Sequence, residues 1–202
     1  MTGTDRRTLQ DFYKFCGWKE LLTAVNSIDD LRDKALFAAT FETGGRAGEV
    51  LSLRKNQFIK YPKVTMVRDM LVEKQRNPKR MHRTFPILNK DALMYPLWDY
   101  LDTLEDDEPL FKFKYMAYYK RLCAVQSKGS KANLAANMWL RWKGPWWGHR
   151  LRAERATQMV VENRAGIFEL MKWFGWARVD MPQRYIELTG GDLIKMIYRG
   201  EL

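Results

Sequence analysis

The stretch Thr43-Gly44-Gly45-Arg46-Ala47-Gly48-Glu49-Val50-Leu51-Ser52-Leu53 is the strongest local signal in the chain. Its two glycines are expected to end a helix, because glycine adopts the left-handed backbone that closes one. Apolar residues spaced from Leu31 to Ala39 predict that preceding helix, with Ser27 as its N-terminal cap. A second short helix is expected over residues 46–53.

Outside this stretch, hydrophobic spacing predicts a chain made mostly of helices. Further helices are expected over residues 9–25, 90–104, 115–126, 150–163, 167–173, 181–188 and 192–198. Residues 64–71 and 81–88 read as extended runs joined by a basic turn at 75–79. We therefore predict an α+β fold, mostly α, with a small antiparallel β-hairpin or three-stranded sheet. Residues 1–202 are expected to form a single domain.

The composition favours a folded protein with a polyanionic partner. Hydrophobic residues make up 46% of the 202, and 35 Lys and Arg outnumber 24 Asp and Glu, which gives a net charge of +11. Such a surplus favours nucleic acid, although ribosomal and membrane-surface proteins share it. No apolar run is long enough to span a bilayer and the first residues are polar, so a cytoplasmic location is expected.

The cysteine pattern argues against a zinc site. Cys16 and Cys123 are far apart, and the chain has no Cys-x-x-Cys pair and no Cys/His cluster. We expect two free thiols, no metal and no cofactor.

Four residues in three segments are suited to holding and attacking one phosphodiester. They are Arg46, His149, Arg152 and Tyr185. Arginine stays charged and pairs with phosphate in two places, and it would stabilise the charge that develops on the nonbridging oxygens. A tyrosine hydroxyl is a suitable nucleophile, because the phenolate can attack and later leave again. Taken singly, each residue reads as an ordinary surface or core side chain, so the interpretation depends on their joint occurrence.

The three segments resemble the boxes of the tyrosine recombinases, or phage-type integrases. Residues 43–53 match the family pattern Thr-Gly-x-Arg-x-x-Glu-x-x-x-Leu, and residues 149–152 match His-x-x-Arg. Phe174-Gly175-Trp176, followed nine residues later by Tyr185, is similar to the family's Leu-Gly-His…Tyr segment, with Trp in the His position. Order and spacing agree over about three-quarters of the chain.

The resemblance implies a role for each matching residue. Arg46 and Arg152 would clamp the scissile phosphate, His149 and Trp176 would support it, and Tyr185 would form a 3′-phosphotyrosyl link. Glu49 would brace the helix of Arg46. The lysine that protonates the leaving 5′ oxygen would be Lys74, with Lys79 as the alternative. We also expect the hairpin's basic residues to bind DNA, namely Arg76, Lys79, Arg80 and Arg83.

Two departures from the family pattern stand out. The family often has His-Thr-Phe after the second arginine, whereas Ala153-Glu154-Arg155 follows Arg152 here, a version similar to archaeal integrases. Residues 1–26 are expected to form only an N-terminal helix or arm, without the separate helical domain that most members carry. Residues 190–202 are expected to form a C-terminal segment that contacts a neighbouring copy.

The function implied by the resemblance is site-specific DNA recombination or integration. The partner would be double-stranded DNA at a specific attachment or recombination site, bound by a DNA-dependent homo-oligomer, expected to be a tetramer. A type IB topoisomerase-like relaxase and a catalytically inactive DNA-binding protein of the same fold are the alternatives. The sequence leaves open whether the tyrosine acts in its own subunit or in a neighbour.

Overall fold

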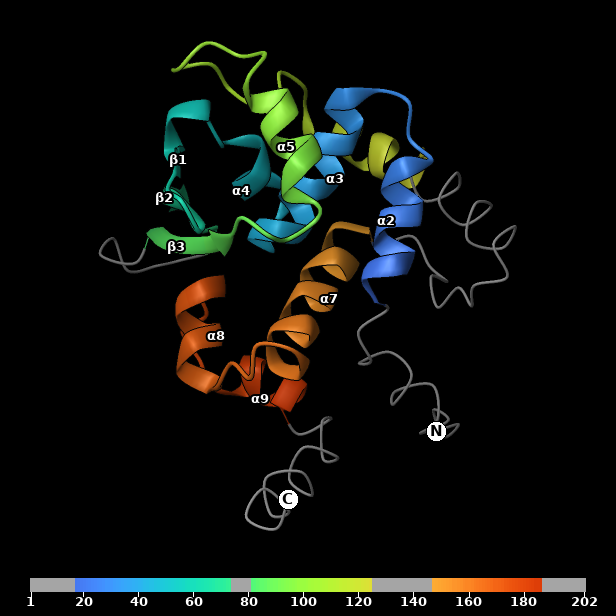
Figure 1. The fold of residues 1–202 in the computed structure, drawn as a ribbon. Coiled ribbons are helices and arrows are strands. Elements are labelled where there is room, and N and C mark those ends of the chain that lie inside the picture. The colour runs from blue at the N-terminus through green and yellow to red at the C-terminus, as the bar shows by residue number, and fades with distance from the viewer. Residues whose placement is uncertain (1–16, 74–80, 125–146, 187–202) are drawn as a thin grey trace.

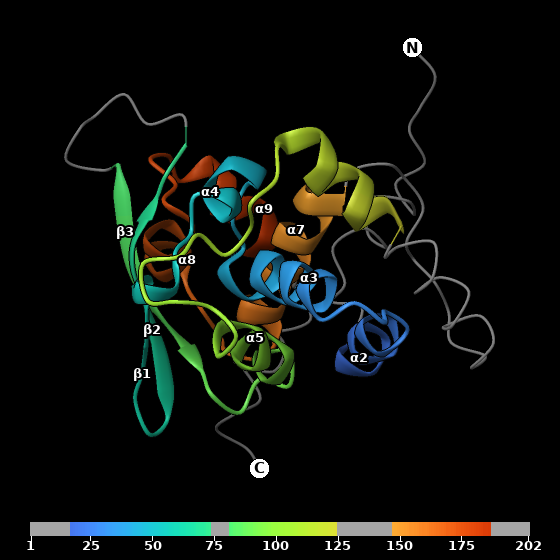
Figure 2. The ribbon, with the colours of Figure 1, turned by 90° about the horizontal axis from the view of Figure 1, so that it is seen from above.

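The structure is a computed structural model that describes residues 17–73, 81–124 and 147–186. The expected turn at 75–79 and the expected helix at 192–198 lie outside these residues. Most of the other helices lie around the central helix α3 (Leu31–Thr43), and a small sheet lies to one side (Figures 1 and 2). Among the described helices, none has both the length and the apolar character needed to cross a bilayer.

Helix α3 forms the core of the larger half of the molecule. Every residue from Ala35 to Thr43 is buried, as expected for a helix that has neighbours on all sides. Its N-terminal cap is Asp30, whose side chain accepts a hydrogen bond from the Asp33 N–H at 3.0 Å. The expectation that Ser27 caps this helix was wrong, because Ser27 ends the preceding helix and donates back to the Ala24 carbonyl. At the other end Gly44 has φ 58°, which confirms the predicted stop.

Four further helical segments pack around α3 or continue from it. They are α2 (Trp18–Asn26), α4 (Ala47–Leu51), α5 (Met94–Leu101) and α7 (Trp147–Val161). Helix α5 is shorter than the predicted 90–104, because residues 91–93 and 102–103 form turns at its ends. Residues 115–124 are also helical, and Arg121 in this segment pairs with Asp33 of α3 at 2.6 Å.

The sheet has three antiparallel strands in the order β1 (Phe58–Lys60), β2 (Val64–Leu71) and β3 (His82–Leu88). In β3, buried and exposed residues alternate, with Phe85 and Ile87 facing the core. In β2 the alternation breaks between Val67 and Met70, where the pairing with β3 shifts and Asp69 has φ 51°. This bulge lets Val67 and Met70 both point inward.

The last described part of the chain builds a second, smaller core. Helices α8 (Ile167–Phe174) and α9 (Asp180–Ile186) pack with α7 around buried residues that include Leu170 and Phe174. Helix α8 also lies against β3, where the rings of Trp173 and Phe85 are 4.8 Å apart (Figure 1). The predicted fold class, mostly helical with a small antiparallel sheet, is confirmed.

Candidate active site

Arg46 enters the site from the turn between α3 and α4. Gly44 and Gly45 reverse the chain after α3, and Arg46 then occupies the N-terminal cap position of α4. Glu49, one turn later, accepts the Arg46 backbone N–H at 3.0 Å and its guanidinium Nη1 at 2.8 Å. The side chain of Glu49 is fully buried, while that of Arg46 is 21% exposed. Arg46 is therefore held on its inner side and open on its outer side.

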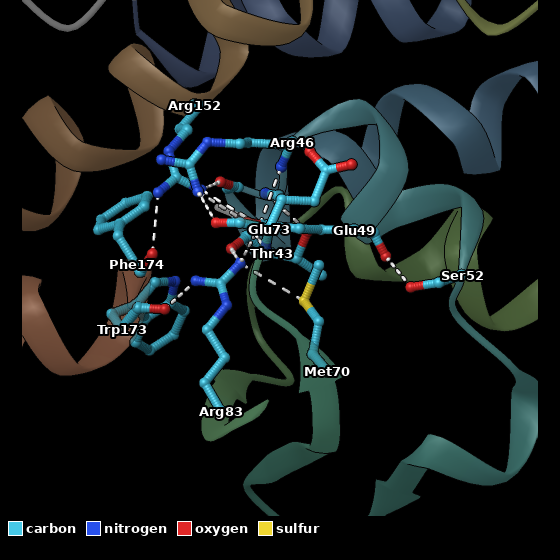
Figure 3. Close-up of polar contacts among 12 residues, drawn as sticks. Thr43, Arg46, Glu49, Ser52, Met70, Glu73, Arg83, Arg152, Trp173 and Phe174 are labelled. Atoms are coloured by element: carbon cyan, nitrogen blue, oxygen red, sulfur yellow. Dashed lines mark hydrogen bonds and ion pairs between the residues drawn. The ribbon is translucent and has the colours of Figure 1, made fainter. Parts of the chain in front are cut away.

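Two more arginines, from distant parts of the chain, reach the same carboxylate. Arg83 of β3 and Arg152 of α7 lie 3.2 Å and 3.4 Å from Glu49 Oε2. Figure 3 shows the guanidinium groups of Arg46, Arg83 and Arg152 gathered around Glu49. We call these four residues the arginine cluster. It joins α4, the sheet and α7 at one point.

Backbone carbonyls at two helix ends complete the support of the buried arginines. Arg152 donates to the carbonyls of Gly44 at 2.5 Å and Phe174 at 2.9 Å. Arg83 donates to the carbonyl of Thr43 at 3.3 Å and to that of Trp173. These carbonyls lie at the C-terminal ends of α3 and α8, where the helix dipole favours positive charge.

The arginine cluster carries a surplus of positive charge. Three guanidinium groups share one carboxylate, which leaves two positive charges unbalanced within the cluster. Burial lowers the pKa of Arg152 to about 9, because desolvation and the other two arginines outweigh the opposing effect of Glu49. Burial likewise lowers the pKa of Arg83 to about 10. A bound anion would relieve this repulsion, so the arrangement favours anion binding.

Next to the cluster, three aromatic rings form a stack. The rings of Phe174 and Trp176 are 4.6 Å apart with planes at 16°, and those of Trp176 and Tyr185 are 5.6 Å apart with planes at 7°. The Arg152 guanidinium carbon lies 5.0 Å and 5.5 Å from the ring centres of Phe174 and Trp176. Tyr185 is close enough to affect the pKa of Arg152. The structure therefore brings Arg46, Arg152, Trp176 and Tyr185 into one region.

Trp176 carries an unused hydrogen-bond donor. Its side chain is buried, and its indole Nε1 donates to no atom of the described residues. A buried donor without a partner costs free energy, so it marks a position where an incoming acceptor would be favoured.

His149 comes from the same helix as Arg152. It is exposed on α7, three residues before Arg152, and therefore on nearly the same face of that helix. The other expected site residues, Lys74, Arg76, Lys79 and Arg80, lie outside the described residues. The residues that the structure does describe contain no group of three or more His, Cys, Asp or Glu placed to hold a metal ion.

Arg83 has an internal position, which differs from the expected DNA contact at the hairpin. It is only 6% exposed, and its guanidinium serves Glu49 and two backbone carbonyls. The sequence contains a signal for this, because Arg83 is in phase with Phe85 and Ile87 along β3. A charged residue at an inward position of a strand indicates a buried partner, here Glu49.

A hollow of about 500 Å³ opens beside the site, between β3 and α8. It is lined in part by His82, Lys172 and Trp176, and by part of Arg83. Its lining thus includes one residue of the arginine cluster and one of the aromatic stack, together with the exposed side chains of His82 and Lys172. The site is consequently open on this side.

Comparisons with known proteins agree on the family. The model of the phage integrase family matches residues 17–190. A crystal structure of XerA recombinase has a TM-score of 0.60 and 20% identity, covering 91% of this chain and 62% of that one. The XerH site-specific recombinase bound to difH, in a pre-cleavage complex, has a TM-score of 0.62 and 16% identity, covering 100% of this chain and 53% of that one.

A post-cleavage complex of XerH with a palindromic difH substrate gives the same TM-score and identity, with 54% of that chain covered. This chain thus spans between about half and three-fifths of the length of these recombinases. At such identities the structural likeness concerns the fold. A search of curated proteins gave no significant match. The family match covers most of the chain, and the chain therefore belongs to the phage integrase family, the tyrosine recombinases.

Proposed function

We propose that the protein is a site-specific DNA recombinase or integrase that cleaves and rejoins DNA through a 3′-phosphotyrosine intermediate. One observation carries the proposal: Arg46 and Arg152, more than a hundred residues apart, converge on Glu49 beside the Trp176–Tyr185 stack. Family membership and the DNA-bound XerH relatives support a double-stranded DNA partner.

In this proposal the scissile phosphate is the anion that the arginine cluster lacks. Arg46 presents the outer face of its guanidinium group, and the buried Arg152 behind it adds a second positive charge in a fixed position. Both would bind nonbridging oxygens, and the charge on these oxygens grows in the transition state. His149 and the unpaired Nε1 of Trp176 would donate to the same phosphate.

The chemical step exchanges one phosphoester for another. The Tyr185 hydroxyl gives up its proton to solvent as its oxygen attacks phosphorus, the bond to the 5′ oxygen breaks, and that oxygen takes a proton from Lys74, or from Lys79 as the alternative. Attack on the new ester by a 5′ hydroxyl reverses the step and releases Tyr185. The bond energy is kept in the phosphotyrosine, so neither ATP nor a metal ion is required.

We further propose that Tyr185 serves the site of its own chain. Its ring belongs to the same hydrophobic cluster as Phe174 and Trp176, and α9, which carries it, packs on α7 and α8. Donating Tyr185 to a neighbour would remove its ring from this cluster and expose apolar surface. The arrangement therefore favours cleavage within one subunit, and a tetramer would contain four complete sites.

A nicked suicide duplex tests the reaction class. A duplex selected by the protein from a random-sequence pool, with a nick just past the cleaved position, loses a short fragment on cleavage and traps the intermediate. We expect a covalent protein–DNA adduct that forms in the presence of EDTA and is absent for Tyr185→Phe. The Tyr95→Phe variant is the matched control, because Tyr95 is an exposed tyrosine on α5.

Other outcomes would favour the alternatives. Sequence-independent relaxation of supercoiled plasmid would indicate a topoisomerase-like relaxase. DNA binding without any adduct, and with Tyr185→Phe equal to wild type in every assay, would indicate an inactive DNA-binding protein.

A further inference from the structure

Arg155 lies at the centre of a second buried ionic cluster, three residues after Arg152 on α7. Its side chain is 1% exposed and lies 3.2 Å from Asp91 Oδ2 and 3.2 Å from Glu42 Oε2. Its Nη1 also donates to Gln158 at 3.1 Å. We call Arg155, Glu42 and Asp91 the Arg155 cluster. It joins α3, α7 and the segment after β3.

Aromatic rings enclose the same guanidinium. Its carbon lies 5.2 Å from the ring centre of Trp173 and 5.5 Å from that of Phe41. Trp173 also supplies the carbonyl that Arg83 binds, so one residue contacts both clusters. The Arg155 cluster is thus packed directly against the supports of the arginine cluster.

The end of α3 links the two clusters residue by residue. Glu42 contacts Arg155 through its side chain, Thr43 accepts Arg83 through its carbonyl, and Gly44 accepts Arg152 through its carbonyl. Three consecutive residues therefore each hold a different arginine. A shift of Glu42 relative to α7 would move the carbonyls that hold Arg83 and Arg152.

The energetics favour a geometric role over a stabilising one. A buried ion cluster adds little net stability, because desolvation offsets the attraction, and apolar replacements of similar volume are often as stable. The cluster does fix the orientation of the side chain, since the planar guanidinium group can bind two carboxylates only in one orientation. In the arrangement described here, that orientation fixes α7 against the end of α3.

We infer that Arg155 is a positioning residue for DNA cleavage: by holding Glu42 and Asp91 it sets the place of the Arg152 guanidinium at the scissile phosphate. The inference rests on the proposed function. Arg155 itself touches neither DNA nor the reacting atoms, because it is buried inside the protein.

The test separates DNA binding from cleavage. Arg155→Met and Arg155→Lys would be compared with wild type on the selected suicide duplex, with affinity measured by fluorescence anisotropy and cleavage measured in single turnover at saturating protein. We expect affinities within about threefold of wild type, because the outer face of Arg46 and the surface cations are unchanged. We expect cleavage to slow by about 10- to 100-fold for Arg155→Met, because displacements of about 1 Å have such effects on rates. Arg155→Lys should lie between that variant and wild type.

Arg121→Met is the matched control. Arg121 also pairs with an aspartate of α3, Asp33, and lies 5.2 Å from the ring centre of Phe113, but it contacts no residue of the arginine cluster. It should cleave at the wild-type rate. Thermal unfolding identifies the folded variants. If Arg155→Met does not fold, the cleavage rate of the charge-conserving variant Arg155→Lys tests the inference.

Wild-type cleavage rates in a folded Arg155 variant would overturn the inference, and so would equal losses in Arg155→Met and Arg121→Met. Failure of wild type to form an adduct would instead count against the proposed function, so the two failures are distinguishable.

Discussion

At the scale of single residues, the two buried clusters have opposite charge balances. In the arginine cluster three cations face the single carboxylate of Glu49. The surplus of positive charge cannot be removed by deprotonation at neutral pH, because arginine stays charged. In the Arg155 cluster one cation faces two carboxylates, and a single proton restores neutrality. The first cluster therefore needs an external anion, while the second can neutralise itself.

Glu42 is the group that would take this proton, and the stability of the fold should report it. Burial raises the pKa of Glu42 from 4.5 to about 8, although Arg155 acts in the opposite direction. The folded protein then binds a proton that the unfolded chain releases. The free energy of unfolding should therefore fall between about pH 4.5 and pH 8.

The variant Glu42→Gln should flatten this decline, by at most about 1.4 kcal/mol per pH unit, the limit set by one proton. Urea unfolding at several pH values measures it, with Glu105→Gln at an exposed position as the control. Parallel curves for wild type and Glu42→Gln would refute the assignment of the proton to Glu42.

At the scale of secondary-structure elements, the ends of α3 and α8 matter most. Both end in a left-handed glycine, Gly44 with φ 58° and Gly175 with φ 67°. The last carbonyls of these two helix ends, including that of Gly44 itself, hold Arg152 and Arg83. The position of each helix end therefore determines where the arginine side chains lie.

The variant Gly44→Ala should be strongly destabilising. A Cβ at this position would lie 2.3 Å from the ring atom Cε1 of Phe174, and the left-handed backbone is strained for alanine. We expect a loss of about 2–4 kcal/mol in the free energy of unfolding, from strain and overpacking together.

Denaturant unfolding checks this prediction, with Gly166→Ala as the control. Gly166 has an ordinary φ of −83°, and its added Cβ would meet only the flexible end of Glu169. The control should lose only about 0.5–1 kcal/mol, because Gly166 is the N-terminal cap of α8 and alanine is a poorer cap than glycine. A loss below about 1 kcal/mol for Gly44→Ala would contradict the described packing of Gly44 against Phe174.

Local sequence patterns predict most of the helices and strands. They fail where the end of an element depends on the elements packed beside it. The stop at Gly44 and strand β2 over Val64–Leu71 match the structure, because glycine geometry and alternation are local properties. Ser27 and Asp30 were equally good local caps for α3, and only the actual end of α2 decides between them. The bulge at Asp69 has no comparable sequence signal.

Motif spacing points to residues that lie together in the structure, but not to the residues that hold them. Arg46, Arg152, Trp176 and Tyr185 were named from the sequence and lie together in the structure. The internal role of Arg83 depends on three partners that are distant in the sequence. Arg155 stands where the family pattern has phenylalanine, and its buried carboxylates lie 113 and 64 residues away. Such pairings are set by tertiary structure alone.

At the scale of the whole molecule, the described residues form two cores joined through α7 and Trp173. The larger core surrounds α3 and the sheet, and the smaller one lies among α7, α8 and α9 (Figure 1). Arg46 and Arg83 come from the first, while Tyr185 belongs to the second. The residues proposed for the site therefore come from both cores.

In the proposed mechanism, a single chain builds a complete cleavage site around one phosphate. Mixing two inactive variants tests it: Tyr185→Phe keeps the arginines without the nucleophile, and Arg152→Gln keeps the nucleophile with a disrupted cluster. The adduct assay with the suicide duplex would be run on each variant alone, on the mixture, and on wild type diluted to match. We expect no adduct from the mixture above the sum of the separate variants. An adduct that appears only in the mixture would show that a neighbour donates Tyr185, and would contradict cleavage within one subunit.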